Sequence, residues 1–371
     1  MDKSFFLASA SLTGAIIGAG VFAIPFVIAN AGVLTSFAYF LVLGLIALGL
    51  HLFLADIVVF TKGKHRLAGY AEKYLGKKGK IITTVATLIG SLGALLAYLI
   101  LSGKFLSLLL PVSALQATFV SWALFSVFLF FGVKLVSILN FWAEALLLLV
   151  VLIIFNVALP EVSLSNFVLT DKAFLFLPFG VLLFSLVGWS AIPEAAEMLK
   201  DKNKLKKAVF VSFLISICFY LVFGLVVSGV SGKLTTEEAF SGLALFLGKK
   251  IIFLAALFGL FNILDSFLIV ALYLRNTLRL DWKMPTLVSF LIVSLTPLAL
   301  FLSGVNSFIG VVGIVGVLTG LVEGIIICLI YQKTLFKTFS KRKASFVKAF
   351  LVFIPLVLFL GFLAEVSKYI F

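Results

Sequence analysis

The sequence predicts an all-α membrane protein, and three observations carry that prediction: the composition, the length of the apolar runs and the placement of the basic residues. Of the 371 residues, 63% are hydrophobic and 12% are charged, and the mean hydropathy is +1.29. Soluble domains are about half apolar and about a quarter charged, and a fold in water could not bury this much apolar surface. The composition therefore excludes a soluble enzyme, a nucleic-acid-binding protein and a disordered chain, and it predicts the lipid bilayer as the protein's surroundings.

The apolar runs predict eleven transmembrane helices. A helix needs about 20 apolar residues to cross the hydrocarbon core of a bilayer, and runs of this order stand between charged or Pro/Gly breaks. They occupy residues 5–30, 33–60, 81–109, 115–133, 135–159, 173–198, 207–230, 250–274, 286–303, 306–331 and 347–370. The stretches 115–159 and 286–331 are each about twice the length of one span, so we expect two helical hairpins with tight turns at residues 132–134 and 303–306.

The Lys and Arg residues predict which ends of these helices face the cytoplasm. If the N-terminus is cytoplasmic, 23 of the 29 Lys and Arg residues fall on the cytoplasmic side and six fall outside. This asymmetry is what the positive-inside rule expects, and merging either hairpin into one span would remove it. We therefore expect a multi-pass protein of the plasma membrane, with its N-terminus in the cytoplasm and its C-terminus outside.

A short motif occurs twice and indicates an internal repeat. Residues 20–25 and 188–193 both read Gly-x-x-Ala-Ile-Pro. Each motif lies in the first span of a five-span unit that ends in a hairpin, and since five is odd, the second unit enters the membrane the other way up. The sequence thus predicts two inverted five-helix repeats, residues 1–160 and 161–331, followed by a basic loop and an eleventh helix in residues 332–371.

The repeated motif also predicts a binding site, because Gly weakens a helix and Pro removes one of its backbone hydrogen bonds. Peptide groups released by such a break are tolerated at membrane depth only when they are buried in protein or line a cavity. Half-helix N-termini attract a carboxylate, and exposed carbonyls attract an ammonium group or a cation. Two facing breaks therefore suit a zwitterion, that is, an amino acid. Close helix packing through Gly14 and Gly18 is the alternative, but packing does not require the same break in the mirrored helix.

Three segments resemble a known superfamily: residues 14–25, 184–194 and 266–272. In order and spacing they resemble the first, sixth and eighth helices of the amino acid–polyamine–organocation superfamily, which has the leucine-transporter fold. Within it, the sequence is most similar to amino acid/auxin permeases and to bacterial aromatic and hydroxy amino acid permeases. The resemblance implies a 5+5 inverted-repeat fold with broken first and sixth helices, and a secondary transporter rather than an enzyme.

In such transporters the substrate carboxylate meets the unwound part of the first helix, and the amino group meets carbonyls of the sixth. The resemblance places the carboxylate side at Ile17, Gly18, Ala19 and Gly20, and the amino side at Phe184, Ser185, Val187 and Gly188. It also implies that Phe22, Phe184 and Trp189 line or gate the side-chain pocket, and that the loop 232–249 acts as an outer lid.

Four acidic residues lie at membrane depth, where a charge is costly and indicates a function: Asp56, Glu144, Asp265 and Glu323. In sodium-coupled members of the superfamily, hydroxyls of the eighth helix help to bind the cation, and Asp265 and Ser266 stand at the equivalent position. Because an acidic residue replaces the usual hydroxyl, we favour a co-transported proton, with Asp265 as the coupling carboxylate and Glu144 as the second choice. A Na⁺ site would lie near Asp265 and Ser266. For Asp56, about one turn from the cytoplasmic end of its span, we favour a contact with water or with a Lys of the next loop, and for Glu323 we favour a polar contact between helices.

The sequence thus predicts a secondary active transporter that moves a neutral amino acid, aromatic or large and apolar by the resemblance, coupled to a proton or sodium gradient. Exchange without ion coupling and, less favoured, a channel are the alternatives. A membrane protease is disfavoured because His51 and His65 provide neither a Ser–His pair nor a zinc motif. We expect no bound cofactor, since Cys218 and Cys328 lack metal-ligand spacing. The oligomeric state is left open.

Overall fold

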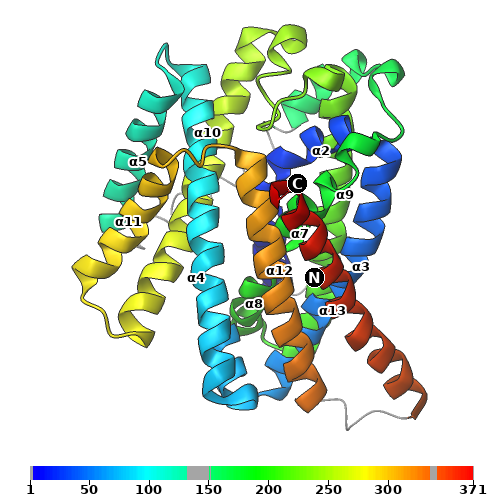
Figure 1. Cartoon of the computed structure of the whole chain (residues 1–371), viewed down its shortest axis with the longest axis vertical. Coiled ribbons are helices and arrows are strands. Elements are labelled where there is room, and N and C mark those ends of the chain that lie inside the picture. The colour runs from blue at the N-terminus through cyan, green and yellow to red at the C-terminus, as the bar shows by residue number, and fades with distance from the viewer. Residues whose placement is uncertain (1–2, 132–149, 151, 335–340, 371) are drawn as a thin grey trace.

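Helices make up the regular structure of the described chain (Figure 1). The computed structural model describes residues 3–131, 150, 152–334 and 341–370, and this part of the protein contains helices and turns but no strand. A helix satisfies its own backbone hydrogen bonds, which is the requirement that a bilayer places on any spanning segment. The predicted all-helical membrane protein is therefore confirmed at the level of its architecture.

The first helix is broken where the sequence predicts a break. Helix α1 (Lys3–Ile17) ends at Gly18, whose φ of 31° lies outside the helical region. The chain continues as a 3₁₀ turn, η1 (Ala19–Ala23), and as α2 (Ile24–Ala31), and the two halves are bent by 42°. Glycine adopts a positive φ without strain because it has no Cβ.

The sixth predicted span has the same form. Helix α7 (Leu177–Leu186) ends before Gly188, and a 3₁₀ turn, η5 (Trp189–Ala191), leads into α8 (Ile192–Met198). Proline lies in the first turn of both α2 and α8, where its missing N–H removes no intrahelical bond. The repeated Ala-Ile-Pro motif therefore marks the start of the second half of each broken helix.

The other long helices are apolar rods, two of them kinked at a glycine. They are α3 (Val33–Phe60), α4 (Leu67–Leu109), α5 (Ala114–Phe131), α9 (Leu205–Ser231), α10 (Ala244–Asn276), α11 (Thr286–Leu302), α12 (Phe308–Thr334) and α13 (Lys341–Ile370). Gly76, with a φ of 77°, separates a short first segment of α4 from its long apolar part. Gly248, with a φ of 76°, forms a similar kink near the start of α10.

Seven helices of the described chain are long and apolar enough to cross a membrane, and the bent pair α1–α2 makes an eighth. Helices α5 and α11 are shorter, at 18 and 17 residues, and both coincide with predicted spans. The predicted span 135–159 falls largely on residues that the structure does not describe, as does the predicted turn at 132–134. The other predicted turn is confirmed, because α11 ends at Leu302, α12 begins at Phe308 and Gly304 between them has a φ of 98°.

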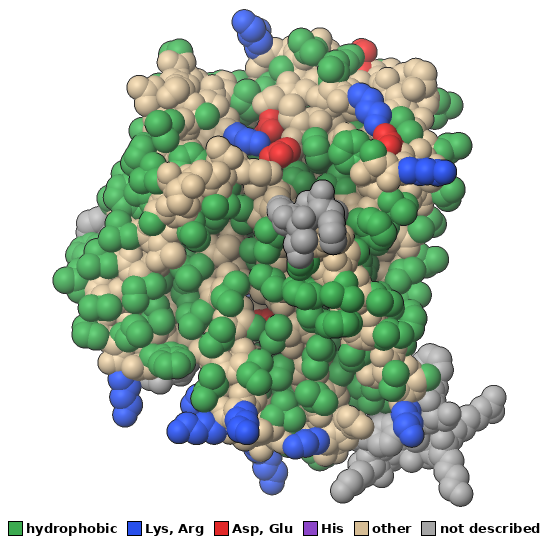
Figure 2. All heavy atoms as spheres, in the orientation of Figure 1, with side chains coloured by type: hydrophobic (Ala, Val, Ile, Leu, Met, Phe, Trp, Pro, Cys, Tyr) green, Lys and Arg blue, Asp and Glu red, His purple; other side chains and the backbone are tan. Residues whose placement is uncertain are grey.

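On the visible face of the bundle, charged side chains lie mainly at the two ends, and the middle is largely hydrophobic. Figure 2 shows hydrophobic side chains over the middle of the visible face, Lys and Arg at the lower edge, and a few charges of both signs near the top. We call the lower edge the basic end. There Lys206 Nζ donates to Asp56 Oδ2 (3.1 Å), and Tyr331 donates to the same oxygen (3.3 Å). Asp56 thus pairs with a Lys, but Lys206 belongs to α9 and not to the loop that follows α3, where the sequence led us to expect the partner.

Ion pairs hold the loops at the opposite end. Lys233 Nζ donates a hydrogen bond to Asp171 (3.1 Å), and this bond lowers the pKa of the Asp171 carboxyl below its ordinary value. Lys104 of α4 donates to Glu237 (3.1 Å), and Glu237 also accepts from the backbone N–H of Phe308 (3.1 Å). The loop 232–243 is thereby held against the ends of α4 and α12.

Glycines allow α12 to pack closely against α7. A side chain at Gly316 would overlap the backbone O of Gly180 and the backbone N of Phe184, and one at Gly320 would overlap Leu183. Small residues let helix backbones approach in a bilayer, where apolar side chains gain nothing by leaving an equally apolar solvent. Close contact with α12 therefore fixes the first half of the second broken helix.

We expect Gly316→Ala to destabilise the fold. The new methyl group would meet backbone atoms of Gly180 and Phe184, which cannot move without displacing α7, and overpacking of this kind costs about 1–3 kcal/mol. The measurement is the thermal unfolding midpoint of the purified protein in detergent. Gly44→Ala is the control, because its methyl group would meet only the terminal carbon of Ile217. Equal midpoints for the two variants would contradict the close packing of α7 on α12.

Candidate functional site

The two helix breaks lie against each other in the interior of the bundle. Ser185 Oγ, near the end of α7, lies 3.2 Å from Gly20 O of η1 and 2.8 Å from Val181 O of its own helix, and the two carbonyls share its one hydrogen. A Cβ atom added to Gly20 would lie 2.8 Å from Ser185 Cα, and one added to Gly188 would lie 3.2 Å from Ile16 Cα. The broken segments therefore touch with nothing between them, and the glycines of both motifs make this approach possible.

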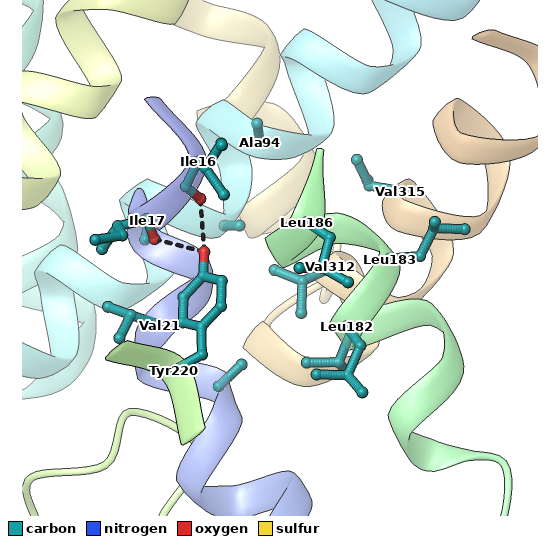
Figure 3. Close-up of a cluster of buried hydrophobic side chains, with 14 of the residues drawn as sticks. Ile16, Ile17, Val21, Ala94, Leu182, Leu183, Leu186, Tyr220, Val312 and Val315 are labelled. Carbon is teal, nitrogen blue, oxygen red and sulfur yellow. Dashed lines mark hydrogen bonds between the residues drawn. The ribbon is translucent and has the colours of Figure 1, made fainter. Parts of the chain in front are cut away.

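A third helix supplies the hydrogen-bond donor for the released carbonyl groups. Tyr220 of α9 is fully buried, and its hydroxyl oxygen lies 2.5 Å from Ile16 O, 3.0 Å from Ile17 O and 2.8 Å from Ser185 O. Figure 3 shows its ring pointing to the end of α1, with the hydrogen bonds to Ile16 and Ile17 drawn. Ile17 ends α1, and Ser185 lies in the last turn of α7, so the C-terminal ends of both first half-helices converge on one hydroxyl hydrogen.

The converging carbonyls make this point electronegative. The last carbonyls of a helix lack an intrahelical partner and carry the negative end of the helix dipole, and two such ends meet here. Such a point binds a hydrogen-bond donor or a cation. Sequence reasoning missed Tyr220, because one Tyr in an apolar span forms no pattern; its polar tip in the middle of the predicted span 207–230 was the only signal.

Aromatic rings pack between the first break and the loop at the opposite end. Phe22 lies edge-on to Phe105 of α4 and to Phe240 of the loop 232–243, with ring centroids 5.1 and 5.5 Å apart. Phe105 and Phe240 are themselves 5.4 Å apart, and all three rings are buried. Phe22 thus contacts the segment that the resemblance identifies as an outer lid.

Trp189 joins the second break to three neighbouring helices. Its ring is fully buried, and its Nε1 donates to Glu323 Oε2 of α12 (2.7 Å). Thr87 of α4 donates to the other oxygen of the same carboxylate (2.9 Å). The ring of His51 in α3 lies 5.6 Å from that of Trp189, and its Nδ1 donates to Ala47 O (2.7 Å). Glu323 is therefore in contact with the break, which the sequence did not indicate.

Asp265 and Ser266, the predicted coupling residues, are half-buried in α10. Asp265 lies within electrostatic range of the hydroxyl of Tyr98 in α4, and Tyr98 lies within the same range of Tyr220. Within the described chain, no three His, Cys, Asp or Glu side chains gather as metal ligands. Glu144, the second choice for coupling, lies outside the described residues.

The structure brings together some of the residues predicted for the carboxylate side and for the amino side of the binding site. Gly20 and Ser185 are in direct contact, and Ile17 and Ser185 share the Tyr220 hydroxyl. Phe184 and Val187 are half-buried beside the second break. Trp189, predicted to line or gate the pocket, lies directly after the second break and donates a hydrogen bond to Glu323.

A bundle of membrane-spanning helices in which two broken helices meet defines a membrane transporter that binds its solute between helices. The chain belongs to the tryptophan/tyrosine permease family, whose family model matches residues 1–366. This is a family of transporters and not of enzymes, and the resemblance to aromatic amino acid permeases is thereby confirmed.

Two relatives and one solved structure are similar to the chain. The chain is 29% identical over 239 residues to tyrosine-specific transport system 1 of Haemophilus influenzae, a match that covers 61% of this chain but only 57% of the relative. It is 26% identical over 336 residues to glutamine transporter 2 of Aliivibrio fischeri, covering 86% of each. The inward-facing conformation of Mhp1 is similar with a TM-score of 0.67 at 14% identity, over 99% of this chain and 91% of that one. The structural likeness assigns the fold to the leucine-transporter type.

We expect Tyr220→Phe to lower the stability of the protein. The substitution leaves three buried carbonyl groups without this donor, and one unsatisfied buried group costs about 1–3 kcal/mol. Thermal unfolding in detergent measures the loss. Tyr74→Phe is the matched control, since the half-buried Tyr74 hydroxyl bonds to a single side chain, Thr61 (2.7 Å). If Tyr220→Phe unfolded no earlier than the control, the released carbonyls would not depend on this hydroxyl.

Proposed function

We propose that the protein is a secondary active transporter of neutral amino acids that works by alternating access in the plasma membrane. The observation that carries the proposal is the meeting of the two helix breaks in the interior, where carbonyls of α1 and α7 converge on one donor. Helix ends that meet inside a membrane bundle form sites for zwitterions and ions in transporters of this kind. Membership of a permease family supports the same class.

The proposed substrate-binding residues follow the two breaks. The carboxylate binds at Ile17, Gly18, Ala19 and Gly20, and the ammonium group binds at the carbonyls around Phe184, Ser185, Val187 and Gly188. The Tyr220 hydroxyl supports the second assignment, because the carbonyl of Ser185 already accepts a donor there (2.8 Å). An ammonium group offers three donors to the same kind of acceptor.

A neutral side chain is the proposed specificity, with an aromatic or large apolar one favoured. The two relatives are named for tyrosine and glutamine, which are both neutral amino acids. The buried ring of Phe22, packed with Phe105 and Phe240, would present apolar surface to a substrate when the cluster separates. Trp189 would line or gate the pocket from the second break.

The described arrangement is closed, so transport requires two different openings. On the side of the loop 232–243, opening separates Phe22 from Phe240 and releases the contacts of Glu237. On the side of the basic end, opening moves one half of each broken helix: α1 of the first and α8 of the second. We propose that the basic end is cytoplasmic, as the excess of Lys and Arg requires, which places the N-terminus in the cytoplasm and the C-terminus outside.

The proposed architecture has eleven transmembrane helices. Residues 1–160 and 161–331 form two inverted five-helix repeats, and residues 332–371 add a basic loop and the eleventh helix. The matching breaks at Gly18 and Gly188, each followed by a 3₁₀ turn and a Pro-initiated helix, support the repeat.

A proton is the proposed co-transported ion, with Na⁺ as the alternative. Asp265 is the proposed coupling carboxylate for a proton, and Glu144 is the second choice. If the ion is Na⁺, its proposed site lies near Asp265 and Ser266. The proximity of Asp265 to Tyr98, and of Tyr98 to Tyr220, supports a polar connection between α10 and the breaks.

We expect purified protein in proteoliposomes to accumulate a labelled neutral amino acid with saturable kinetics. Tyrosine, tryptophan, phenylalanine and glutamine are the amino acids to compare, with lysine and aspartate as charged controls. Competition by an excess of unlabelled amino acid separates a transporter from a channel, because flux through a channel does not saturate at such concentrations. Absence of saturable uptake for every neutral amino acid would contradict the proposal.

We expect Asp265→Asn to abolish uphill uptake driven by a pH gradient while leaving exchange of internal for external amino acid intact, because the neutral amide cannot carry a proton. Asp171→Asn is the control, since this carboxylate pairs with Lys233 at the end of the bundle. Unchanged pH-dependent accumulation in Asp265→Asn would remove Asp265 from the mechanism. Wild-type protein that exchanges but never accumulates would favour the uncoupled exchanger.

A further inference from the structure

Glu323 is a buried carboxylate with two hydrogen-bond donors from two other helices. It lies in α12 and is 8% exposed, in an apolar part of the bundle. Trp189 Nε1 donates to Oε2 at 2.7 Å, and Thr87 Oγ1 donates to Oε1 at 2.9 Å. Each carboxylate oxygen thus has one donor, and neither donor carries a charge.

The described helices packed on α12, with α8 beside Trp189, carry other groups that titrate. They are Tyr39, His51 and Asp56 of α3, Tyr70, Glu72, Lys73, Tyr74, Lys77, Lys78, Lys80, Tyr98 and Lys104 of α4, Glu194 and Glu197 of α8, Cys328, Tyr331 and Lys333 of α12, and Lys348 and Glu365 of α13. Asp56 is paired with Lys206 at the basic end. His51 contacts the Trp189 ring rather than a carboxylate oxygen. None of the described Lys and Arg residues forms an ion pair with Glu323.

A carboxylate in this position changes state with little rearrangement. Charge buried in an apolar medium is unfavourable unless a counter-charge compensates it, and the two neutral donors compensate it only in part. A proton added to either oxygen leaves that oxygen a second lone pair, so the two donors need not leave. What changes is the strength of the bonds, because a donor binds an ionised carboxylate more strongly than a neutral carboxylic acid.

A change in the charge of Glu323 affects the second helix break, because Trp189 adjoins that break. Trp189 is the first residue of η5, directly after the break at Gly188, and Gly188 lies against Ile16 of the first broken helix. With Glu323 ionised, the charge-assisted bond holds the indole on α12. With Glu323 neutral, the bond is weaker, and η5 is free to move relative to α12 and α4.

We propose that Glu323 takes up and releases a proton during the transport cycle and thereby controls how firmly Trp189 holds the second helix break. The step is a protonation alone: a proton from water adds to a carboxylate oxygen, the charge changes from −1 to 0, and no covalent bond between heavy atoms changes. Glu323 is a positioning residue, since it acts on the break through Trp189. The role in transport rests on the proposed function, whereas the titration of the Glu323–Trp189 pair does not.

Tryptophan fluorescence tests the pair without any transport assay. The substitutions W122F, W142F and W282F leave Trp189 as the one Trp among the chain's four. We expect its emission in this background to show one transition when the purified protein is titrated over about pH 4–9, and we expect E323Q to abolish the transition. E365Q, which removes another buried carboxylate, is the control and should keep it.

A second variant leaves Glu323 in place and predicts a direction. T87V removes one donor to the ionised form, so the midpoint of the Trp189 transition should move to higher pH, by about one unit or more. T84V is the matched control, because Thr84 lies one turn earlier in α4 and bonds to Lys80 O of its own helix (2.8 Å). A flat emission curve, a transition that survives E323Q, or an unmoved midpoint in T87V would overturn the proposal. A transition lost in H51Q but kept in E323Q would assign the proton to His51 instead.

Transport separates the failure of this proposal from the failure of the proposed function. In proteoliposomes, E323Q should bind and exchange amino acid but lose accumulation driven by a pH gradient. If E323Q accumulates substrate as the wild type does while Trp189 still titrates with Glu323, the role of Glu323 in coupling is overturned. If wild-type protein transports no amino acid at all, the proposed function fails, and the fluorescence result on the pair is unaffected.

Discussion

A peptide group released inside a membrane must find its hydrogen-bond partner within the protein, because hydrocarbon offers none. Both broken helices meet this requirement in the same place. Gly20 O accepts from Ser185 Oγ, and the carbonyls of Ile16, Ile17 and Ser185 surround the hydroxyl of Tyr220. The breaks are therefore confined to the interior, next to each other and next to α9, and the rest of the bundle is arranged around that point.

The close approach of the two breaks leaves no room for side chains where they touch, and this limits which groups can recognise a substrate. Gly20 and Gly188 carry no Cβ where the segments touch, and glycines of α12 let α7 pack deeply enough to present its end to α1. Apart from the hydroxyls of Ser185 and Tyr220, the polar groups that meet are backbone atoms, which a substitution cannot easily remove. Selectivity for a particular side chain must then come from the rings and loops around them, such as Phe22 and Trp189, and related proteins can differ in substrate without altering the breaks.

The two sides of the meeting point are closed by different means. Toward the end of the bundle that lies opposite the basic end, the rings of Phe22, Phe105 and Phe240 pack under the loop 232–243. Glu237 holds this loop against α4 and α12. Beside the second break, a buried carboxylate holds an indole. An apolar contact opens when substrate or water separates the rings, whereas the contact of Trp189 with Glu323 depends on charge. The first contact is apolar and the second is a hydrogen bond to a carboxylate, so under the proposals above a substrate would act on the rings and a proton on the contact of Trp189 with Glu323.

The helices and their breaks could be predicted from the sequence because the membrane imposes a length, and because Gly and Pro have few uses inside a span. The predicted span 33–60 has the bounds of α3, and the motif at residues 20–25 marks the start of α2. The contacts of Tyr220 and Glu323 could not be predicted. They depend on how each helix is rotated, and a helix that is apolar on all sides carries no stripe that reports its rotation. For Glu323 the sequence predicts a contact between helices, but it does not identify the two partners, Trp189 and Thr87.

The central claim is that the facing breaks bind one zwitterion, and calorimetry on the purified protein tests it most directly. The ligands are the amino acid that binds most tightly, the matching acid without its amino group, and the matching amine without its carboxyl group. We expect the amino acid to bind and each analogue to bind about tenfold to a hundredfold more weakly, since each lacks one charge-assisted contact worth about 1.5–3 kcal/mol. An analogue that binds as tightly as the amino acid would contradict the claim.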